Sequence, residues 1–327
     1  MTGRCLVVHP GALGDVLLAG PALAHLCALG FRTTLAVASR LAALLRGSGL
    51  VDDARDIEGL GLHRLFVERV DPGVLDSLAS FDALVCWLGA GDPTFRTNLA
   101  RAGRPLALGR AAPLPGSGRH ASRHLLETLA PLGPVPSALP LVRLGVTSSG
   151  RAMAGAWLAA RGIGLEEAIV LQPGAGSAVK TWPGFSDLTR RLRDADLRVV
   201  VLAGPADDET VETLLGTGAV VEERVARDWP LSEVAALLSL ARCAVGNDSG
   251  PTHLAAAVGC STVAVFGPTD PAVWAPLGAH VRVVAGRPGA PWADVDSVEA
   301  ALRALLEGPG AGAATEAARA GSGQSWP

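Results

Sequence analysis

The residue types best suited to chemistry gather in the string N-D-S-G-P-T-H, residues 247–253, which follows a short apolar strand at Cys243–Gly246. Asn247 breaks that strand, and either Asp248 or Ser249 is a good N-cap for a following helix. Such a helix turns its unpaired N–H groups and the positive end of its dipole outward, where they suit a pyrophosphate. The string therefore predicts an anion site at a helix N-terminus.

Three neighbouring residues shape the N-terminal end of this predicted helix, which we call its mouth. Gly250 leaves the mouth open, Pro251 suits a first helical turn, and His253 lies where its imidazole could reach the same anion. A plainer interpretation is that Asp248 is only a cap, His253 a satisfied polar residue and Gly250-Pro251 an ordinary turn. A second buried strand is expected at Thr262–Phe266.

A second candidate is the loop H-P-G-A-L-G-D, from His9 to Asp15, which joins an apolar strand at Arg4–Val8 to an apolar helical stretch at Val16–Leu29. The spacing is not G-x-G-x-x-G, so a dinucleotide fingerprint is poorly supported. Asp15 stands at the helix N-terminus, where the dipole keeps a carboxylate ionised, and a positioned carboxylate can act as a general base. The alternative is an acid that merely stabilises its helix.

A third candidate is the loop P-G-A-G-S-A-V-K-T-W-P, Pro173–Pro183, which follows a buried strand. Gly174 allows close backbone approach to a phosphate, and Ser177 offers a hydroxyl. Lys180, the single lysine of the chain, supplies a compact charge that could neutralise a departing diphosphate. The P-loop pattern G-x-x-x-x-G-K-[ST] is absent, and a flexible loop with one surface lysine is the alternative.

A carboxylate after the next predicted strand, Leu197–Ala203, could accept hydrogen bonds from ribose hydroxyls. Of the acids in G-P-A-D-D-E we expect Glu209 to do so, with Asp208 as second choice, although an ordinary acidic helix start would look the same.

A basic loop lies between residues 110 and 124. It is either a solvated surface loop or a patch that faces an anionic acceptor sugar. Its candidate acceptor-side residues are Arg110, Arg119, His120 and Arg123.

The elements that must position these residues alternate between strand and helix, which predicts an α/β fold with parallel sheets covered on both faces. Ligands bind such sheets beyond the carboxyl ends of the strands. A stretch rich in Pro, Gly and Ser at 130–150 indicates an interdomain linker. We therefore expect one domain over residues 1–147 and a second over 148–296. The Gly/Ala/Ser-rich tail at 308–327 is predicted to be disordered.

Composition narrows the function classes. The net charge of -3, without a block of like charge, argues against nucleic-acid binding. The five cysteines form no C-x-x-C pair and read as buried thiols in a reducing compartment. Neither a signal peptide nor a spanning helix is recognised, so a cytoplasmic protein is expected, with peripheral contact at the inner membrane left open. The sequence shows no cluster of His and Cys residues that would indicate a metal site.

Three strings together resemble glycosyltransferase family nine, the ADP-heptose:lipopolysaccharide heptosyltransferase family. They are G-D at Gly14-Asp15, K-T-W-P at Lys180–Pro183, and the segment Asn247–Pro271 with its ending F-G-P-T-D-P. The resemblance spans nearly all of residues 4–306. It implies a GT-B architecture, in which two Rossmann-like domains face a central cleft. The first domain would serve the acceptor and the second the donor, and a C-terminal helix at 297–307 could return to the first domain.

The resemblance also implies an inverting, metal-independent transfer of a heptose or related sugar from an ADP-sugar to a lipopolysaccharide-core or other glycan, with no cofactor besides the donor. Asp15 would be the base, and Lys180 would bind the donor diphosphate and stabilise the leaving ADP. The other implied donor-binding residues are Gly14, Gly174, Ser177, Glu209, Asn247, Asp248, Ser249, Gly250 and His253. Some family members have hydroxyl residues where this chain has Ala175 and Gly176, where backbone N–H groups would substitute.

Two further functions stay open. A sugar-nucleotide epimerase of the 2-epimerase type shares the two-domain fold, but a full set of acid and base groups for the sugar ring is not evident. A non-catalytic sugar-nucleotide-binding protein is the other alternative. The sequence fixes neither the sugar, the nucleobase and the acceptor, nor the oligomeric state.

Overall fold

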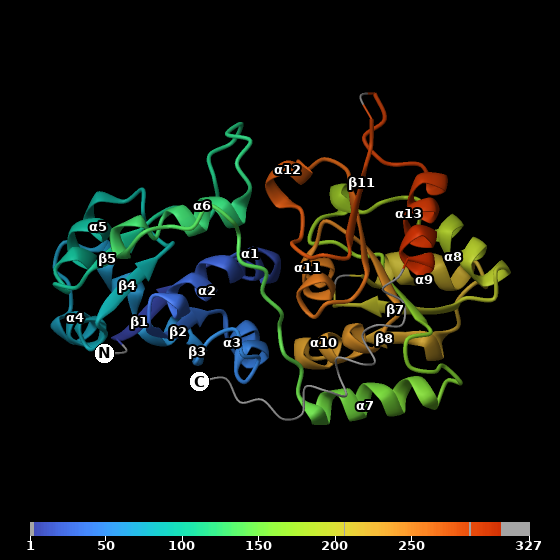
Figure 1. Cartoon of the computed structure of the whole chain (residues 1–327), viewed down its shortest axis with the longest axis horizontal. Helices are drawn as coiled ribbons and strands as arrows, with labels where there is room; N and C mark the ends of the chain where they lie inside the picture. Colours follow the sequence, from blue (N-terminus) through green and yellow to red (C-terminus); the bar gives the residue numbers. More distant parts are fainter. Residues whose placement is uncertain (1–2, 206, 288, 309–327) are drawn as a thin grey trace.

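The computed structural model describes residues 3–205, 207–287 and 289–308. Two parallel sheets, each flanked by helices, form the two halves of the molecule (Figure 1). The tail that was predicted to be disordered lies, apart from Gly308, outside the described residues. No helix in the described part of the chain is long and apolar enough to cross a membrane.

The first sheet has the strand order β3-β2-β1-β4-β5, and all its pairs are parallel. Its strands are β1 (Gly3–Val8), β2 (Phe31–Val37), β3 (Asp53–Asp56), β4 (Ala83–Cys86) and β5 (Leu106–Leu108). Its helices are α1 (Leu13–Leu18), α2 (Gly20–Ala28), α3 (Ser39–Leu45), α4 (Pro72–Ala79), α5 (Pro93–Ala100) and α6 (Ala121–Glu127).

The second sheet has the order β11-β10-β9-β6-β7-β8, also parallel throughout. Its strands are β6 (Ala168–Gln172), β7 (Arg198–Ala203), β8 (Val225–Arg227), β9 (Cys243–Asn247), β10 (Thr262–Phe266) and β11 (Val281–Ala285). Its helices are α7 (Ser148–Ala159), α8 (Phe185–Asp194), α9 (Asp208–Gly216), α10 (Leu231–Leu240), α11 (Gly250–Ala257), α12 (Pro271–Trp274) and α13 (Val295–Glu307).

Two predicted helices differ from the structure. The stretch expected as one helix at Val16–Leu29 is divided into α1 and α2, because Pro21 has no N–H to continue the ladder and instead occupies the first turn of α2. The C-terminal helix does not return to the first domain. Its buried residues Val298 and Leu302, spaced one helical turn apart, pack into the core of the second sheet, and α13 contacts β9, β10 and β11 there.

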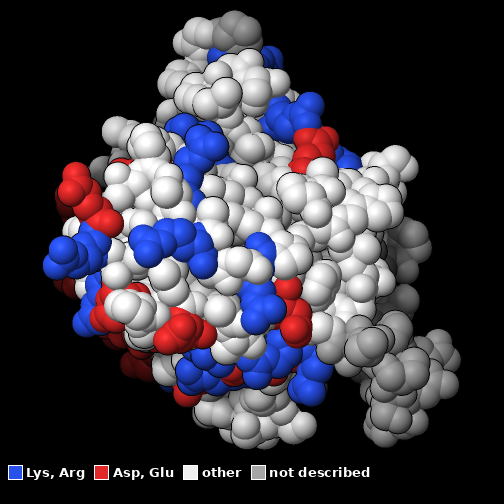
Figure 2. Space-filling view, turned by 90° about the vertical axis from the view of Figure 1, so that its left-hand side faces the viewer, with Lys and Arg blue, Asp and Glu red and all other residues white. Residues whose placement is uncertain are grey.

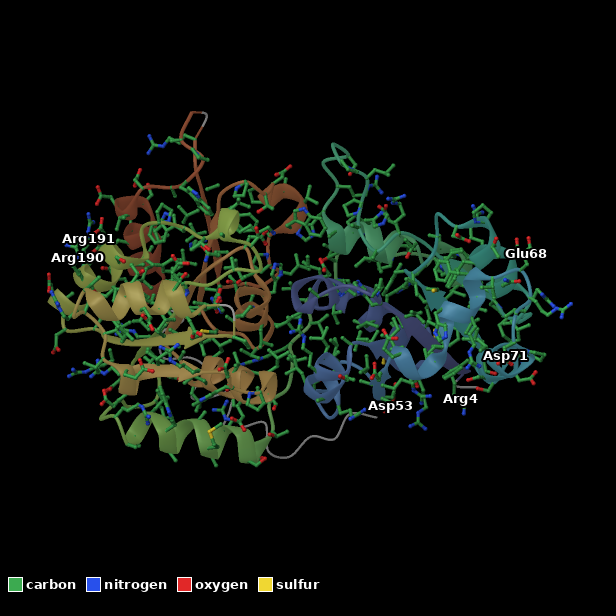
Figure 3. The ribbon with its side chains drawn as sticks, turned by 180° about the vertical axis from the view of Figure 1, so that it is seen from behind. Arg4, Asp53, Glu68, Asp71, Arg190 and Arg191 are labelled. Carbon is green, nitrogen blue, oxygen red and sulfur yellow. The ribbon has the colours of Figure 1, made fainter. Side chains whose placement is uncertain are left out.

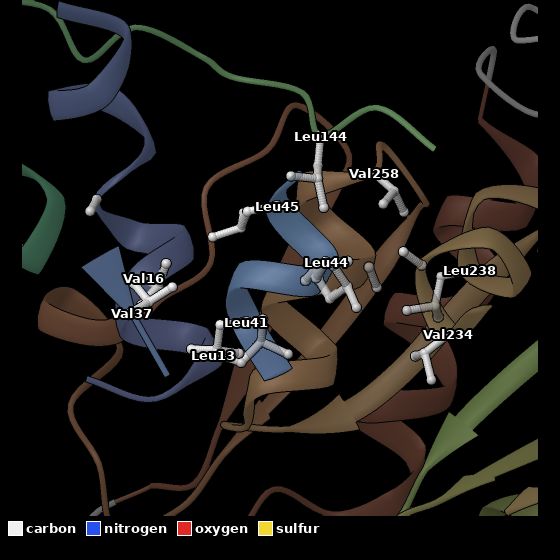
Figure 4. Close-up of a cluster of buried hydrophobic side chains, with 14 of the residues drawn as sticks. Leu13, Val16, Val37, Leu41, Leu44, Leu45, Leu144, Val234, Leu238 and Val258 are labelled. Atoms are coloured by element: carbon white, nitrogen blue, oxygen red, sulfur yellow. The ribbon is translucent and has the colours of Figure 1, made fainter. Parts of the chain in front are cut away.

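The two halves share one apolar core. Leu13 of α1 and Leu41 of α3 belong to the same buried cluster as Val234 and Leu238 of α10, which lie in the second half (Figure 4). A large apolar interface of this kind restrains the relative motion that two domains otherwise have. The helices at the junction are therefore held in a defined relative position.

The charged side chains are distributed differently from the apolar side chains of the shared core. On the end of the molecule formed by the first half, basic and acidic side chains are interspersed (Figure 2). Figure 3 places Arg190 and Arg191 at the outer end of the second half and Glu68 and Asp71 at the opposite end. Ion pairs such as Arg191 with Glu299 are exposed and contribute little to stability. The way the halves meet depends on the apolar junction instead.

We expect Leu41→Ala to lower the free energy of unfolding by about 2–5 kcal/mol, since Leu41 is 1% exposed and its removal leaves a cavity in the shared core. Urea unfolding followed by tryptophan fluorescence measures this. Leu141→Ala is the matched control, because Leu141 is 69% exposed and its truncation should change stability by less than about 0.5 kcal/mol. Equal effects of the two substitutions would contradict the shared core.

Candidate functional site

The N-terminal turns of α1 and α11 meet across the junction between the halves (Figure 1). A Cβ atom on Gly14 would lie 3.1 Å from Cδ2 of His253, and one on Gly250 would lie 2.9 Å from Cβ of Leu13. A side chain at position 250 would therefore displace Leu13, and one at position 14 would press against the ring of His253. The contact brings the loop before α1, which carries one candidate motif, against the helix that carries another.

Asp15 is the third residue of α1 and is half-buried. Its Oδ2 accepts a hydrogen bond from the backbone N–H of Ala12 at 2.9 Å, the residue that caps the helix. This bond orients the carboxylate toward the loop before α1. Asp15 follows Gly14 directly, so its backbone lies next to the contact between the two helices.

Asp248 is the centre of a polar cluster at the mouth of α11. Its Oδ2 accepts hydrogen bonds from Nζ of Lys180 at 2.9 Å and from Oγ1 of Thr269 at 2.7 Å, and Nε2 of His253 lies 3.7 Å from its Oδ1. Burial by itself would raise the pKa of Asp248, but the nearby imidazole of His253 and the hydrogen bonds from Lys180 and Thr269 outweigh it and lower the pKa to about 2. The ionised carboxylate thus holds the lysine beside the helix mouth.

Asn247 and Ser249 use their side chains within the protein. Asn247 is fully buried; its Oδ1 accepts from the N–H of Trp182, and its Nδ2 donates to the carbonyls of Pro173 and Gly174. It therefore fastens both ends of the loop between β6 and α8, residues 173–184. Ser249 occupies the N-cap position of α11, yet its hydroxyl donates to Oε1 of Gln172 instead of capping the helix.

A cavity of about 470 Å³ opens beside this cluster, at the carboxyl ends of β6, β7 and β8. Gly176, Ser249 and Gly250 line one part of it, while Asp207 and Trp229 line another. The first half contributes Ala12, Leu13 and Arg40 to its wall. Its size suits a nucleotide-sized ligand.

Asp207 and Asp228 are the acids that line this cavity, whereas Glu209 lines a separate recess beside Trp182. Burial raises the pKa of Asp207, and the charges of Asp208 and Asp228 add to the effect, while the N–H of Gly204 opposes it. A Cβ on Gly174 would come within 1.9 Å of Oδ1 of Asp207, so the carboxylate lies directly on the β6–α8 loop.

Asp207 is not distinguished by the sequence from the two acids that follow it. It precedes the first turn of α9, in the loop that leaves β7, whereas Asp208 and Glu209 already belong to the helix. Asp208 pairs with Arg227 at 2.9 Å on the surface. Ser177 is also exposed and makes no cap bond in the loop.

The basic loop is mostly engaged in contacts within the protein. Arg119 pairs with Glu127, and Arg123 donates to the carbonyls of Pro136 and Ser137 in the linker. These bonds fix the loop and the linker. They leave Arg110 as the member of this set whose side chain has no hydrogen bond or ion pair among the described residues.

His120 links the two halves. Its Nδ1 accepts from the N–H of Ser122, so Nε2 carries the proton and donates to the carbonyl of Ala275 at 3.0 Å. Burial lowers the pKa of His120, the bond to Ala275 opposes this, and the nearby His253 lowers it further. His120 thus connects the basic loop to the neighbourhood of the α11 cluster.

We expect Asp248→Asn to destabilise the protein by roughly 2 kcal/mol near neutral pH, because the folded-state pKa of about 2 lies below the ordinary value of 3.8. A lowered carboxyl pKa stabilises the fold above pH ~4, and this contribution is lost as the pH falls toward ~2. Urea unfolding of both proteins across this range should show the difference shrinking. Asp194→Asn, which changes an exposed acid, is the control; a difference independent of pH would contradict the cluster.

Comparison with known proteins gives a consistent picture. Residues 143–299 match the family model "Glycosyltransferase family 9 (heptosyltransferase)". Lipopolysaccharide heptosyltransferase 3 of Escherichia coli is 32% identical over 113 residues, which cover 33% of each chain, and lipopolysaccharide heptosyltransferase 2 of E. coli K12 is 29% identical over 119 residues, 34% of each. The matched segment thus spans about a third of the length of these curated relatives.

Solved structures match over much more of the chain. The glycosyl transferase family 9 protein of Veillonella parvula covers 94% of this chain and 98% of its own, with a TM-score of 0.73 and 20% identity. E. coli ADP-heptose LPS heptosyltransferase II covers 93% and 98%, with a TM-score of 0.69 and 20% identity, and E. coli heptosyltransferase WaaC with ADP covers 92% and 99%, with 0.65 and 21%. At these identities the structures establish the GT-B fold. Residues 143–299 are thus similar to glycosyltransferase family 9, and the chain as a whole has the fold of the heptosyltransferases.

Proposed function

We propose that the protein is an inverting, metal-independent glycosyltransferase that moves a heptose or related sugar from an ADP-sugar to a lipopolysaccharide-core or other glycan acceptor. The observation that carries this proposal is the meeting of α1 and α11. It brings the turn that carries Asp15 against the N-terminal turn of α11, which directly follows the aspartate that binds Lys180. The match of residues 143–299 to the family 9 model and the similarity to heptosyltransferases support the sugar class.

The donor would occupy the cavity of about 470 Å³ with its diphosphate toward α11. The N–H groups at the mouth of α11 and the ammonium of Lys180 supply positive charge for the phosphates. The nucleoside would lie toward Trp229, where Asp207 can accept hydrogen bonds from ribose hydroxyls. A related structure, E. coli heptosyltransferase WaaC, is described with ADP, which supports a nucleotide of this class.

Transfer would follow from this arrangement. Asp15 takes the proton of an acceptor hydroxyl, whose oxygen attacks the anomeric carbon on the face opposite the diphosphate and so inverts the configuration. The C–O bond to the diphosphate breaks, and Lys180 with the helix dipole stabilises the charge on the departing ADP. One oxygen of Asp15 holds Ala12 while the other is available for the acceptor.

The acceptor would enter from the first half, and Arg110 is the basic residue best placed to meet an anionic glycan, since its side chain makes no bond within the described chain. A glycan or lipid-linked glycan is the proposed partner, with the protein in the cytoplasm and in peripheral contact with the inner membrane. The donor serves as the only small-molecule partner in this scheme.

We expect Asp15→Asn to lower kcat at least about 100-fold, which is the lower range for loss of a general base, while the affinity for ADP changes less than about threefold. Lys180→Ala should weaken ADP binding as well as transfer. The donor is first chosen by thermal shift with ADP-, UDP- and GDP-sugars, and calorimetry with ADP then separates binding from turnover. Unchanged transfer by Asp15→Asn would show that the base is a different residue.

We also expect Asp207→Ala to weaken ADP binding about tenfold or more, because a carboxylate that accepts hydrogen bonds from the ligand contributes roughly 1.5–3 kcal/mol. Glu209→Ala is the matched control and should change the affinity less than twofold, since Glu209 lines a different recess. Calorimetric titration with ADP and adenosine measures both. If Glu209→Ala has the larger effect, the ribose is held on the other side of the β6–α8 loop.

A further inference from the structure

The loop that leads to Asp15 rests on a buried histidine. His9 follows β1 directly and is 0% exposed. Its ring packs edge-on against Trp87, with the centroids 5.3 Å apart and the planes at 68°. Burial lowers the pKa of His9 to about 4, so its imidazole is neutral near pH 7.

The neutral ring has a defined tautomer. Nδ1 accepts a hydrogen bond from the backbone N–H of Gly11 at 3.0 Å, so the proton resides on Nε2. Nε2 has no hydrogen-bond partner among the described residues. A buried donor without a partner costs about 1–3 kcal/mol. An apolar ring would avoid that cost, so the useful contribution of the imidazole is made through Nδ1.

Two consecutive amides of the loop are held by side chains on either side of it. The N–H of Gly11 binds His9, and the N–H of Ala12 binds Oδ2 of Asp15. A Cβ on Gly11 would lie 2.6 Å from Cε1 of His9 and 2.7 Å from Cβ of Asp15. The imidazole of His9 and the side chain of Asp15 therefore both lie against the backbone of Gly11, and a side chain at position 11 would not fit between them.

We propose that His9 is a positioning residue for Asp15. By fixing the N–H of Gly11, His9 sets the orientation of the next peptide, whose N–H fixes the carboxylate. This role rests on the proposed function of Asp15 as the base. It assigns a task in the reaction to a side chain that touches neither donor nor acceptor.

Two substitutions separate the Nδ1 contact from the bulk of the ring. In His9→Asn, Oδ1 is as many bonds from Cβ as Nδ1 of histidine and can accept from the same N–H; we expect kcat within about threefold of the original protein. In His9→Phe the acceptor is absent; we expect kcat to fall at least tenfold while KM for the donor changes less than twofold. A role in packing alone would instead penalise asparagine more than phenylalanine.

The chain offers a matched control in His25, a second buried histidine whose Nε2 has no partner among the described residues. It lies on α2, away from the loop, so His25→Phe should leave kcat unchanged. If His9→Phe does not fold, Gly11→Ala tests the same contact, because its methyl group must displace His9 or Asp15; it too should lower kcat at least tenfold. Full kcat in His9→Phe or in Gly11→Ala would overturn the proposal.

Amide hydrogen exchange of Gly11 and Ala12 in the substrate-free protein tests the contact without any activity. Exchange should be at least tenfold faster in His9→Phe and unchanged in His9→Asn. If exchange follows this pattern but the original protein transfers no sugar, the proposed function fails while His9 still positions the loop. If His9→Phe leaves the exchange of both amides unchanged, the positioning role fails whatever the activity.

Discussion

The close approach of α1 to α11 is the constraint on which the rest of the site depends. Glycines at 14 and 250 allow His253 and Leu13 to come within contact distance of the facing backbone. Leu13 continues from there into the apolar core shared by the two halves. The contact that aligns the two helix mouths is therefore part of the contact that joins the halves. A substitution at the junction would alter stability and site geometry together.

The polar residues at this junction act mostly by holding one another. Asp248 is ionised and binds Lys180 and Thr269. Both the oxygen and the nitrogen of the Asn247 side-chain amide form hydrogen bonds with the β6–α8 loop. Because buried polar groups need partners, such a network specifies a single arrangement. In this arrangement, the lysine is at the helix mouth before a ligand arrives, which reduces the ordering that binding requires.

In the first half, the orientation of Asp15 is fixed in a similar way. Asp15 holds Ala12, and the neighbouring amide is held by a histidine that is buried at the end of β1. Each side of the junction thus presents a charged group whose orientation is fixed by neighbours in its own domain. The relative position of the two groups is then left to the apolar contact between helices.

The sequence by itself determined the local elements and the kind of site. Apolar runs and their breakers predicted β10 with the bounds seen in the structure and the starts of β1 and β7 to within one residue, and the strand–helix alternation predicted parallel sheets. These features depend on residues close in the chain. The strings around Lys180 and Asp248 also indicated an anion site, since helix mouths and glycine-rich loops have local signatures.

Only the tertiary structure decided which side chains face the ligand cavity. Asp207 and Glu209 are two positions apart and chemically alike, yet they line different cavities, because the turn into α9 points them in different directions. The sequence likewise could not predict three other features: the partners of Asn247, the packing of α13, and the hydrogen bond between Gly11 and His9. The first two depend on contacts between segments far apart in the chain, and the third on the backbone dihedrals of the loop, which the residue types alone do not fix.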